Sequence, residues 1–204
     1  MDVGTETLVN STTADTQRNP SITGLDDGGY VVAWQSYLQD GEQWGIYTQQ
    51  YNSSGIAVGS ETLVNTTTAS QQLHPSITGL DDGGYVVAWM SYNQDGDGYG
   101  IYTQQYNSSG IAVGSETLVN TTTASHQYYP SITGLDDGGY VVAWQSYLQD
   151  GEQWGIYTQQ YASDGTTAAV FLESDGLETI HTGTLSLTTD QDTTEKHTFQ
   201  IDPA

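Results

Sequence analysis

The chain of 204 residues repeats itself every 55 residues, and this period limits the possible folds more than any single motif does. The sequence Glu-Thr-Leu-Val-Asn begins at Glu6 and returns at Glu61 and Glu116. The block 28–51 returns unchanged as 138–161. A fixed period of this length is typical of stacked or circular arrays, in which each unit buries a face against its neighbour. We therefore expect an array of repeated supersecondary units.

Each unit contains four segments with the pattern of β-strands, separated by turns rich in Asp, Asn, Ser and Gly. Residues 30–34 are apolar on both alternating faces, which predicts a strand that is covered on both sides. No segment of the repeats has a helical period, so we expect an all-β region of four-stranded antiparallel units. In the first unit the expected strands are residues 20–25, 30–34, 45–51 and 56–65.

Four strands in one period are the size of a β-propeller blade, whereas an immunoglobulin-like sandwich needs nearly twice that length. The expected fold is therefore a set of propeller blades, and a linear β-stack or solenoid is the alternative. We expect residues 1–165 to form the three-repeat region. Residues 166–204, where the repeat stops, read as a β tail with a hairpin pattern at 183–189 and 196–201.

The sequence begins with the fourth strand of a unit and ends its third unit without a fourth strand. Residues 5–10 supply a lone fourth strand, and the third unit ends near Gly165 without its own Glu-Thr-Leu-Val-Asn. Three blades do not close a ring, because propellers typically have 4 to 8. One hypothesis is a homodimer in which each lone strand completes the last blade of the other copy, giving a six-bladed ring. The other is that the sequence is a segment of a longer array.

The charge of the chain limits its partners. The chain has 25 Asp and Glu residues and only two basic residues, Arg18 and Lys196, which gives a formal net charge of −23. This balance repels phosphate backbones and anionic lipids and favours cations such as Ca²⁺, so we expect neither a nucleic acid partner nor membrane insertion. Without cysteine, any metal must be held by oxygen. Few lysines among many Asp, Asn, Thr, Ser and Gly are typical of bacterial secreted proteins, which predicts an extracellular or cell-surface location.

Each unit contains Pro-Ser-Ile-Thr-Gly-Leu-Asp-Asp-Gly-Gly-Tyr-Val-Val-Ala-Trp, followed by Gln-Asp-Gly and Gly-Ile-Tyr-Thr-Gln-Gln-Tyr. With these motifs the repeats resemble those of very long bacterial surface and secreted proteins, including calcium-dependent adhesins. The tail, with Thr182–Asp190 and Thr198–Asp202, resembles the start of a cadherin-like, VCBS-type repeat. These resemblances imply extracellular attachment, calcium dependence and a modular array, and they supply no catalytic residues to transfer.

The acidic loop of each unit is the candidate calcium site. In the second unit Asn93, Asp95 and Asp97 stand at alternate positions before a glycine, which is the spacing with which a calcium loop wraps its ion. The other units have leucine in place of the asparagine, and their candidate ligands are Asp40 with Glu42 and Asp150 with Glu152. The competing interpretation is a solvated hairpin loop.

Two sets of aromatic residues recur. Trp34, Trp89 and Trp144 lie within a strand and are expected in the core. Trp44, Tyr99 and Trp154 lie beside the acidic loop, where a ring and nearby carboxylates can stack on a sugar and accept its hydroxyl protons. Packing beneath the loop is the competing interpretation of this second set. The three copies differ most at 17–19, 72–74 and 127–129. This divergence reflects either selection for the choice of ligand or tolerance of substitutions in a loop.

The inventory of side chains argues against an enzyme. Sialidase-like propellers hold a substrate carboxylate with several arginines, and this chain has one. Aspartate side chains accept hydrogen bonds from nearby backbone amides in tight turns, which explains the aspartate pairs at 26–27, 81–82 and 136–137. The histidines form no repeated arrangement with a carboxylate. Two non-enzymatic functions remain. The first is a calcium-stabilised structural and adhesive module that binds surface or matrix glycans or proteins, and the second is a multivalent carbohydrate-binding propeller.

Overall fold

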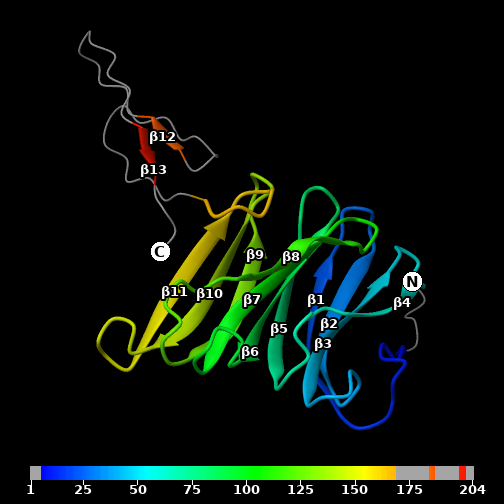
Figure 1. Ribbon diagram of the computed structural model, residues 1–204. Coiled ribbons are helices and arrows are strands. Elements are labelled where there is room, and N and C mark those ends of the chain that lie inside the picture. The colour runs from blue at the N-terminus through cyan, green and yellow to red at the C-terminus, as the bar shows by residue number, and fades with distance from the viewer. Residues whose placement is uncertain (1–5, 169–183, 187–197, 201–204) are drawn as a thin grey trace.

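The computed structural model describes residues 6–168, 184–186 and 198–200, and its repeats form three twisted antiparallel sheets (Figure 1). The first and second sheets have four strands each, and the third has three. The first contains β1 (Gln17–Gly24), β2 (Tyr30–Tyr37), β3 (Trp44–Tyr51) and β4 (Ala57–Leu63); the second contains β5 (Gln72–Gly79), β6 (Tyr85–Tyr92), β7 (Tyr99–Tyr106) and β8 (Ala112–Leu118); the third contains β9 (Gln127–Gly134), β10 (Tyr140–Tyr147) and β11 (Trp154–Tyr161).

The prediction of four-stranded antiparallel β units is confirmed, and the described residues contain no helix. The first strand of each unit begins earlier than expected, at Gln17 in the first unit, because the chain pairs with β2 on both sides of a β-bulge. The bulge lies between Arg18 and Ser21 and contains Pro20. Proline without an amide hydrogen is commonly found at such an irregularity, which is why the sequence pattern hid the start of the strand.

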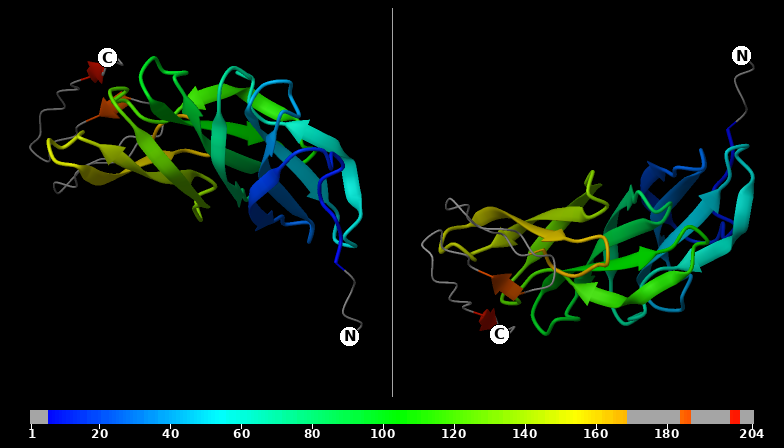
Figure 2. Two further views of the ribbon diagram at one scale, coloured as in Figure 1. Left: turned by 90° about the horizontal axis from the view of Figure 1, so that it is seen from below. Right: turned by 90° about the horizontal axis from the view of Figure 1, so that it is seen from above.

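The sheets pack face to face, with the four-stranded sheet β5–β8 between the other two (Figure 2). Their first strands β1, β5 and β9 contact one another in sequence. Thr23 Oγ1 accepts a hydrogen bond from Gly79 N at 2.9 Å, and Thr78 Oγ1 accepts one from Gly134 N at 2.8 Å. Because the same bond recurs one period later, both junctions between sheets have the same geometry.

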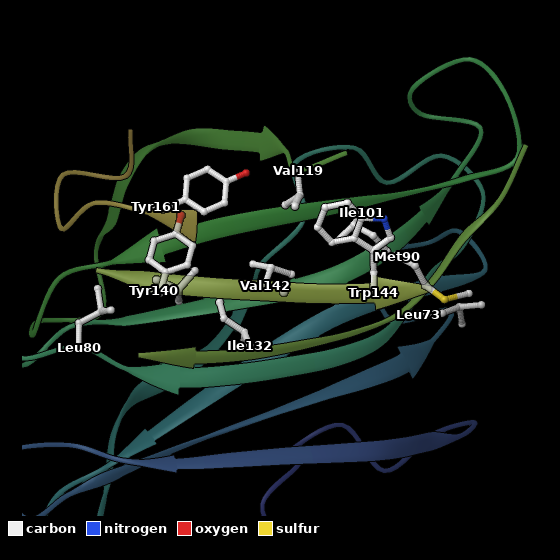
Figure 3. Close-up of a cluster of buried hydrophobic side chains, with 12 residues drawn as sticks. Leu73, Leu80, Met90, Ile101, Val119, Ile132, Tyr140, Val142, Trp144 and Tyr161 are labelled. Carbon is white, nitrogen blue, oxygen red and sulfur yellow. The ribbon is translucent and has the colours of Figure 1, made fainter. Parts of the chain in front are cut away.

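Two clusters of buried apolar side chains fill the junctions. Between the first and second sheets Val31, Ala33 and Ile46 meet Trp89 and its neighbours. Between the second and third sheets the corresponding cluster is drawn in Figure 3, where Met90 and Ile101 face Trp144. The expected core tryptophans are buried, at 0 to 5% exposure. Trp89 and Trp144 lie in the clusters between blades, as in a propeller, and Trp34 lies in a third cluster on the outer face of the first sheet.

One repeated sequence has two different patterns of burial. β2 and β10 have the same sequence, yet the six central residues of β2 are buried whereas β10 alternates between buried and half-buried residues. Both strands lie in end sheets, and the difference arises because Val9 packs on the outer face of the first sheet, over Val32 and Trp34, whereas the described residues supply no such cover for the third sheet. The prediction that residues 30–34 are covered on both faces thus holds for 31–34, with Tyr30 half-buried.

The two ends of the repeat region differ from a complete blade. Residues 6–10 are not in a strand, and Val9 packs against the outer face of the first sheet. After Gly165, Thr167 forms a bridge with Tyr161, and Ala168 N donates to Gln160 O at 2.9 Å. The edge of β11 that was expected to be open from Gly165 is therefore partly paired by the described residues that follow.

The tail contributes one described element. β12 (Thr184–Ser186) pairs antiparallel with β13 (Thr198–Gln200), at the two places where the sequence has a hairpin pattern. The other predictions for residues 169–183, 187–197 and 201–204, and for residue 5, concern positions outside the described residues. Within the described part of the chain, no helix is long and apolar enough to cross a membrane.

Candidate functional site

All the predicted site residues lie at one end of the array, which we call the loop end. Here the inner strands β1, β5 and β9 begin and the acidic loops 38–43, 93–98 and 148–153 connect neighbouring strands. The aspartate-rich turns lie at the opposite end, where Asp27 Oδ1 accepts a hydrogen bond from Gly29 N at 2.8 Å. Asp82 and Asp137 make the same bond in their units, so each of these carboxylates holds its own turn.

The three candidate ligand-binding rings differ in exposure. Trp44 is half-buried, with the Arg18 guanidinium 4.1 Å from its ring centroid, and it bridges to Gln71 of the second unit. Tyr99 is also half-buried, and its hydroxyl donates to Gln71 Oε1 at 3.2 Å. Trp154 is 48% exposed. The following unit covers Trp44 and Tyr99, and the described residues provide no such cover for Trp154.

The rings of the second and third units join into one surface, which we call the aromatic cluster. Tyr128 lies at its centre, 5.2 Å from Tyr99 and 5.5 Å from Trp154. Tyr129 is 54% exposed and Tyr92 is 43% exposed. Burial raises the pKa of Tyr99 and of Tyr128, with smaller contributions from neighbouring tyrosines, so these hydroxyls stay protonated. The cluster comprises Tyr92, Tyr99, His126, Tyr128, Tyr129, Tyr147 and Trp154.

A row of three side chains connects the units at the loop end. Asn19, His74 and Tyr129 occupy equivalent positions, one before each proline. Asn19 Nδ2 lies 3.5 Å from His74 Nδ1, and the His74 ring meets the Tyr129 ring edge-on at 4.8 Å. All three have a left-handed backbone with φ of 54°, which is uncommon outside glycine. The bulge in each inner strand therefore aims three different side chains into one place.

Electrostatics determine the protonation of His74 in this row, and hydrogen bonds fix the positions of Asn19 and His74. Burial lowers the pKa of His74, and the nearby positive charge of Arg18 lowers it further, so the imidazole is neutral near pH 7. Gln35 Oε1 accepts from Asn19 Nδ2 at 2.9 Å and from His74 N at 3.0 Å, which fixes the first two members. Tyr129 is the exposed member, and its hydroxyl can donate to a ligand or accept from one.

The acidic loops use their carboxylates on their own backbone. Asp40 Oδ1 accepts from Glu42 N at 3.1 Å, and Asp150 Oδ1 accepts from Glu152 N at 3.2 Å. In the middle loop Asp97 Oδ2 accepts from Ser125 N at 3.0 Å. Asp95 Oδ1 accepts from Asp97 N, and Asn93 is exposed with φ of 59°. Across the described residues, no three His, Asp or Glu side chains converge as a metal site.

The same loops hold a second set of buried oxygens. Gln39 Nε2 donates to Glu61 Oε2 at 2.7 Å, while Gln39 Oε1 and Asp40 Oδ2 are buried without a hydrogen-bond partner. Desolvation, followed by the negative charges of Asp40 and Glu61, raises the pKa of Tyr47 to about 12. Tyr102 has the corresponding environment in the second unit, and its pKa is also raised to about 12. These phenols remain neutral donors beside the carboxylates.

The structure places the predicted site residues in different surroundings. Trp44, Tyr99 and Trp154 are not equivalent, because two of them are half-buried by the next unit. The variable segments, including Tyr128 and Tyr129, were not predicted as site residues, and they supply the centre of the aromatic cluster and the row across the units. Divergence confined to one position of near-identical copies was the signal that could have found them.

No protein-family model matches the sequence, and no curated protein matches it either. Solved structures share its fold. They include an α-L-arabinofuranosidase from Lactobacillus brevis (TM-score 0.53, 9% identity, 78% of this chain and 57% of that one). They also include the Hadza microbial sialidase Hz136 (0.53, 12%, 74% and 36%). A protein of unknown function from Dyadobacter fermentans is similar as well (0.54, 12%, 79% and 56%).

These similarities define the class of fold. At such identities they show the fold alone, and together with the four-stranded sheets they identify the repeats as β-propeller blades. The chain spans about a third to little more than half of the length of the structures that it matches. The prediction of propeller blades is therefore confirmed over the linear stack.

Proposed function

We propose that this chain is a non-enzymatic carbohydrate-binding module of a bacterial surface or secreted protein, with the aromatic cluster as its binding surface. The observation that carries the proposal is the gathering of exposed rings from two units at the loop end, around Tyr128. Aromatic faces stack on the apolar faces of sugars, and nearby hydroxyls and carboxylates satisfy the sugar hydroxyls. Two neighbours of similar fold are named for activity on sugars, which supports this ligand class.

The cluster favours one principal site over three equal ones. At the junction of the first and second units, the equivalents of Tyr128 and Tyr129 are Leu73 and His74. Leu73 is buried, so this junction offers less exposed aromatic surface than the next one. We infer that a glycan binds at the second junction and that multivalency arises between copies of the module rather than within it.

The absence of catalysis is part of the proposal. The chain has a single arginine, and the carboxylates of the described loops accept hydrogen bonds from backbone amides. Holding the backbone of the loop is a structural role that explains these carboxylates without catalysis. We expect any bound oligosaccharide to be recovered intact after incubation with the protein.

A glycan array, followed by titration of the best ligand, tests the proposal. The copies themselves supply suitable variants: Tyr128→Leu and Tyr129→Asn install residues that already occupy the equivalent positions 73 and 19. Losing one stacking ring is expected to weaken binding by about five- to tenfold. Ile111→Ala, at an exposed site outside the cluster, is the control. Failure to bind any glycan would refute the proposed function. So would an affinity in both tyrosine variants equal to that of the unmodified protein.

A structural and adhesive role stabilised by calcium remains the second candidate, favoured by the buried oxygens of Gln39 and Asp40 that have no hydrogen-bond partner. Unpaired buried oxygens cost free energy that a bound cation would offset. A calcium titration separates the two candidates, because stacking on a sugar face requires no metal. This role predicts a thermal midpoint that rises with calcium in the absence of any glycan.

A further inference from the structure

The outer edge of β11 is incomplete in one half. In the first sheet, β3 pairs with β4 in two stretches separated by a register shift: Ala57 and Val58 in one, Thr62 and Leu63 in the other. Gly59, with φ of 68°, lies at the shift. In the third sheet Thr167 and Ala168 reproduce the first stretch. Within the described residues, no segment occupies the second.

The exposure of equivalent residues shows which groups of the third sheet the described residues leave uncovered. Ile46 and Ile101 are completely buried, each in the apolar cluster between its own sheet and the next one, whereas their equivalent Ile156 is 73% exposed. In the complete sheets Val64 N donates to Ile46 O at 2.8 Å, and Ile46 N donates to the side chain of Asn65 at 2.7 Å. The second sheet has the same two bonds between Ile101 and the segment 119–120. Among the described residues, the side chain and two backbone groups of Ile156 thus lack the partners that their equivalents have in the first and second sheets.

The sequence that follows Ala168 does not match this stretch. The positions equivalent to Leu63, Val64 and Asn65 are Glu173, Ser174 and Asp175, whose structure lies outside the described residues. The matching sequence stands at the other end of the chain, where residues 6–10 read Glu-Thr-Leu-Val-Asn. Leu8 of this segment is 68% exposed. Asn10 donates to Thr12 and Gln17 as Asn65 does to Thr67 and Gln72, but among the described residues no amide donates to Asn10 Oδ1 as Ile46 N does to Asn65 Oδ1.

We propose that residues 6–10 of a second copy complete the third sheet. The hydrogen bonds that the outer segment makes in the first and second sheets, moved forward by one period of 55 residues, give the contacts expected between the third sheet and the second copy. Val9 N of the second copy donates to Ile156 O, and Asn10 Oδ1 accepts from Ile156 N. Glu61 accepts from Gln39 and from Ser11 N, and Glu116 from Gln94 and Thr66 N. Glu6 of the second copy accordingly accepts from Gln149 Nε2 and Thr121 N.

The faces of the two end sheets complement each other in the same way. Ser21 Oγ accepts from Ile77 N at 3.3 Å, and Ser76 Oγ accepts from Ile132 N at 3.3 Å. The next member of this series pairs Ser131 with Ile22 N of the second copy. Ile22 is 64% exposed, whereas Ile77 and Ile132 are buried. Association therefore buries the two isoleucines, 22 and 156, that stand exposed at the ends of the array.

A single chain does not make this contact with itself. Val9 packs on the first sheet, and β11 lies in the third, with the second sheet between them (Figure 2). Each copy presents one spare segment and one incomplete edge, so two copies associate reciprocally. The three repeat sheets of the described residues in each of two copies give six blades, which lies within the 4 to 8 that are typical of propellers.

Mass measurement in solution tests the proposal with the unmodified chain. We expect twice the chain mass of 22.0 kDa by light scattering at micromolar concentration. Leu8→Asp and Ile156→Asp each place a charge in the proposed interface, yet both residues are exposed in the single chain, so folding is retained. We expect each variant to have the mass of one chain. Ile111→Asp, at a residue that is 63% exposed, is the control and stays paired.

A disulfide tests the register directly, because the chain has no cysteine of its own. Thr48 pairs with Thr62, so Thr158 is expected to face Thr7 of the second copy. Opposed residues in antiparallel strands lie within the Cα separation of a disulfide. Thr7→Cys with Thr158→Cys should give a dimer under oxidation. Leu8→Cys with Thr158→Cys, on opposite faces, should not.

The outcomes decide the proposal. A single-chain mass for the unmodified protein, open-ended polymers in place of a pair, or a dimer that both aspartate variants retain would each overturn it. Cross-linking that is equal in the two cysteine pairs would overturn the register. Glycan binding is measured separately, so failure of this proposal leaves the proposed function intact.

Discussion

The contact between inner strands can be tested with three glycines in the same local sequence. Gly24, Gly79 and Gly134 each stand in Ser-Ile-Thr-Gly-Leu-Asp-Asp. A Cβ at Gly79 would lie 2.6 Å from Gly24 O, and one at Gly134 would lie 2.8 Å from Gly79 O. A Cβ at Gly24 would meet nothing within 4 Å. The three alanine variants therefore differ only in whether a neighbouring sheet blocks the new methyl group.

The magnitudes follow from the overlap. A carbon 2.6 Å from an oxygen must move by more than half an ångström, and overpacking of this kind costs about 1 to 3 kcal/mol. The shift also weakens the bond from Gly79 N to Thr23 Oγ1, worth about 1 kcal/mol. Alanine restricts the unfolded chain in all three variants and so stabilises each by about 0.4 to 1 kcal/mol. We expect Gly79→Ala to destabilise by about 1 to 3 kcal/mol and Gly24→Ala to be neutral or slightly stabilising.

Urea unfolding followed by tryptophan fluorescence measures this difference. The comparison is made in the Leu8→Asp background, which keeps the chain single under the pairing proposed above. Equal destabilisation by Gly24→Ala and Gly79→Ala in that background would show that the contact between sheets is not the cause. In the paired protein Gly24 meets the second copy, so Gly24→Ala should weaken pairing there.

Three further outcomes are expected. Asn65→Ala leaves the buried Ile46 amide unpaired and should lower the free energy of unfolding in urea by about 2 to 4 kcal/mol. Asn10→Ala in the single chain is the control, and a smaller loss for Asn65→Ala than for Asn10→Ala would contradict the role of Asn65 as the partner of that amide. Because the pKa of His74 is lowered, the folded state binds fewer protons than the unfolded state, so stability should fall as the pH drops below about 6.5. His74→Asn should reduce this loss, and an unchanged pH profile would count against it. Under the calcium-stabilised role, the second candidate, millimolar calcium should raise the thermal midpoint and do so less in Asp97→Asn, whereas no shift would contradict a calcium site in that loop.

Much of the fold could be predicted because the local pattern and the tertiary contacts agree. The β-branched and aromatic run 30–34 and the glycine turn before it specify a buried hairpin wherever the unit stands. The start of each inner strand could not be predicted, since Pro20 reads as a boundary and is in fact part of a bulge. Burial at each end of the array also escaped prediction, because it depends on whether a neighbouring sheet is present.

The site was harder to predict because its chemistry arises between units rather than within one. Trp44 and Tyr99 match Trp154 in the repeat, and the following unit covers the first two. Tyr129 is a single variable residue in the sequence, yet the bulge brings it to His74 from the preceding unit. A period of 55 gives the positions that are equivalent, and only the packing of neighbouring units decides which of them are exposed.

The repetition also explains why exposed residues at the two ends carry information that ordinary exposed residues lack. A lone exposed isoleucine needs no explanation on a protein surface. Ile156 does, because two residues in the same sequence context, Ile46 and Ile101, are completely buried. The complete sheets thus act as internal references, and the partner that we propose for Ile156 follows from them down to the side chain of Asn10. Under that proposal, near-identical copies turn the edge of β11 into a binding site for one short sequence, which this chain itself contains.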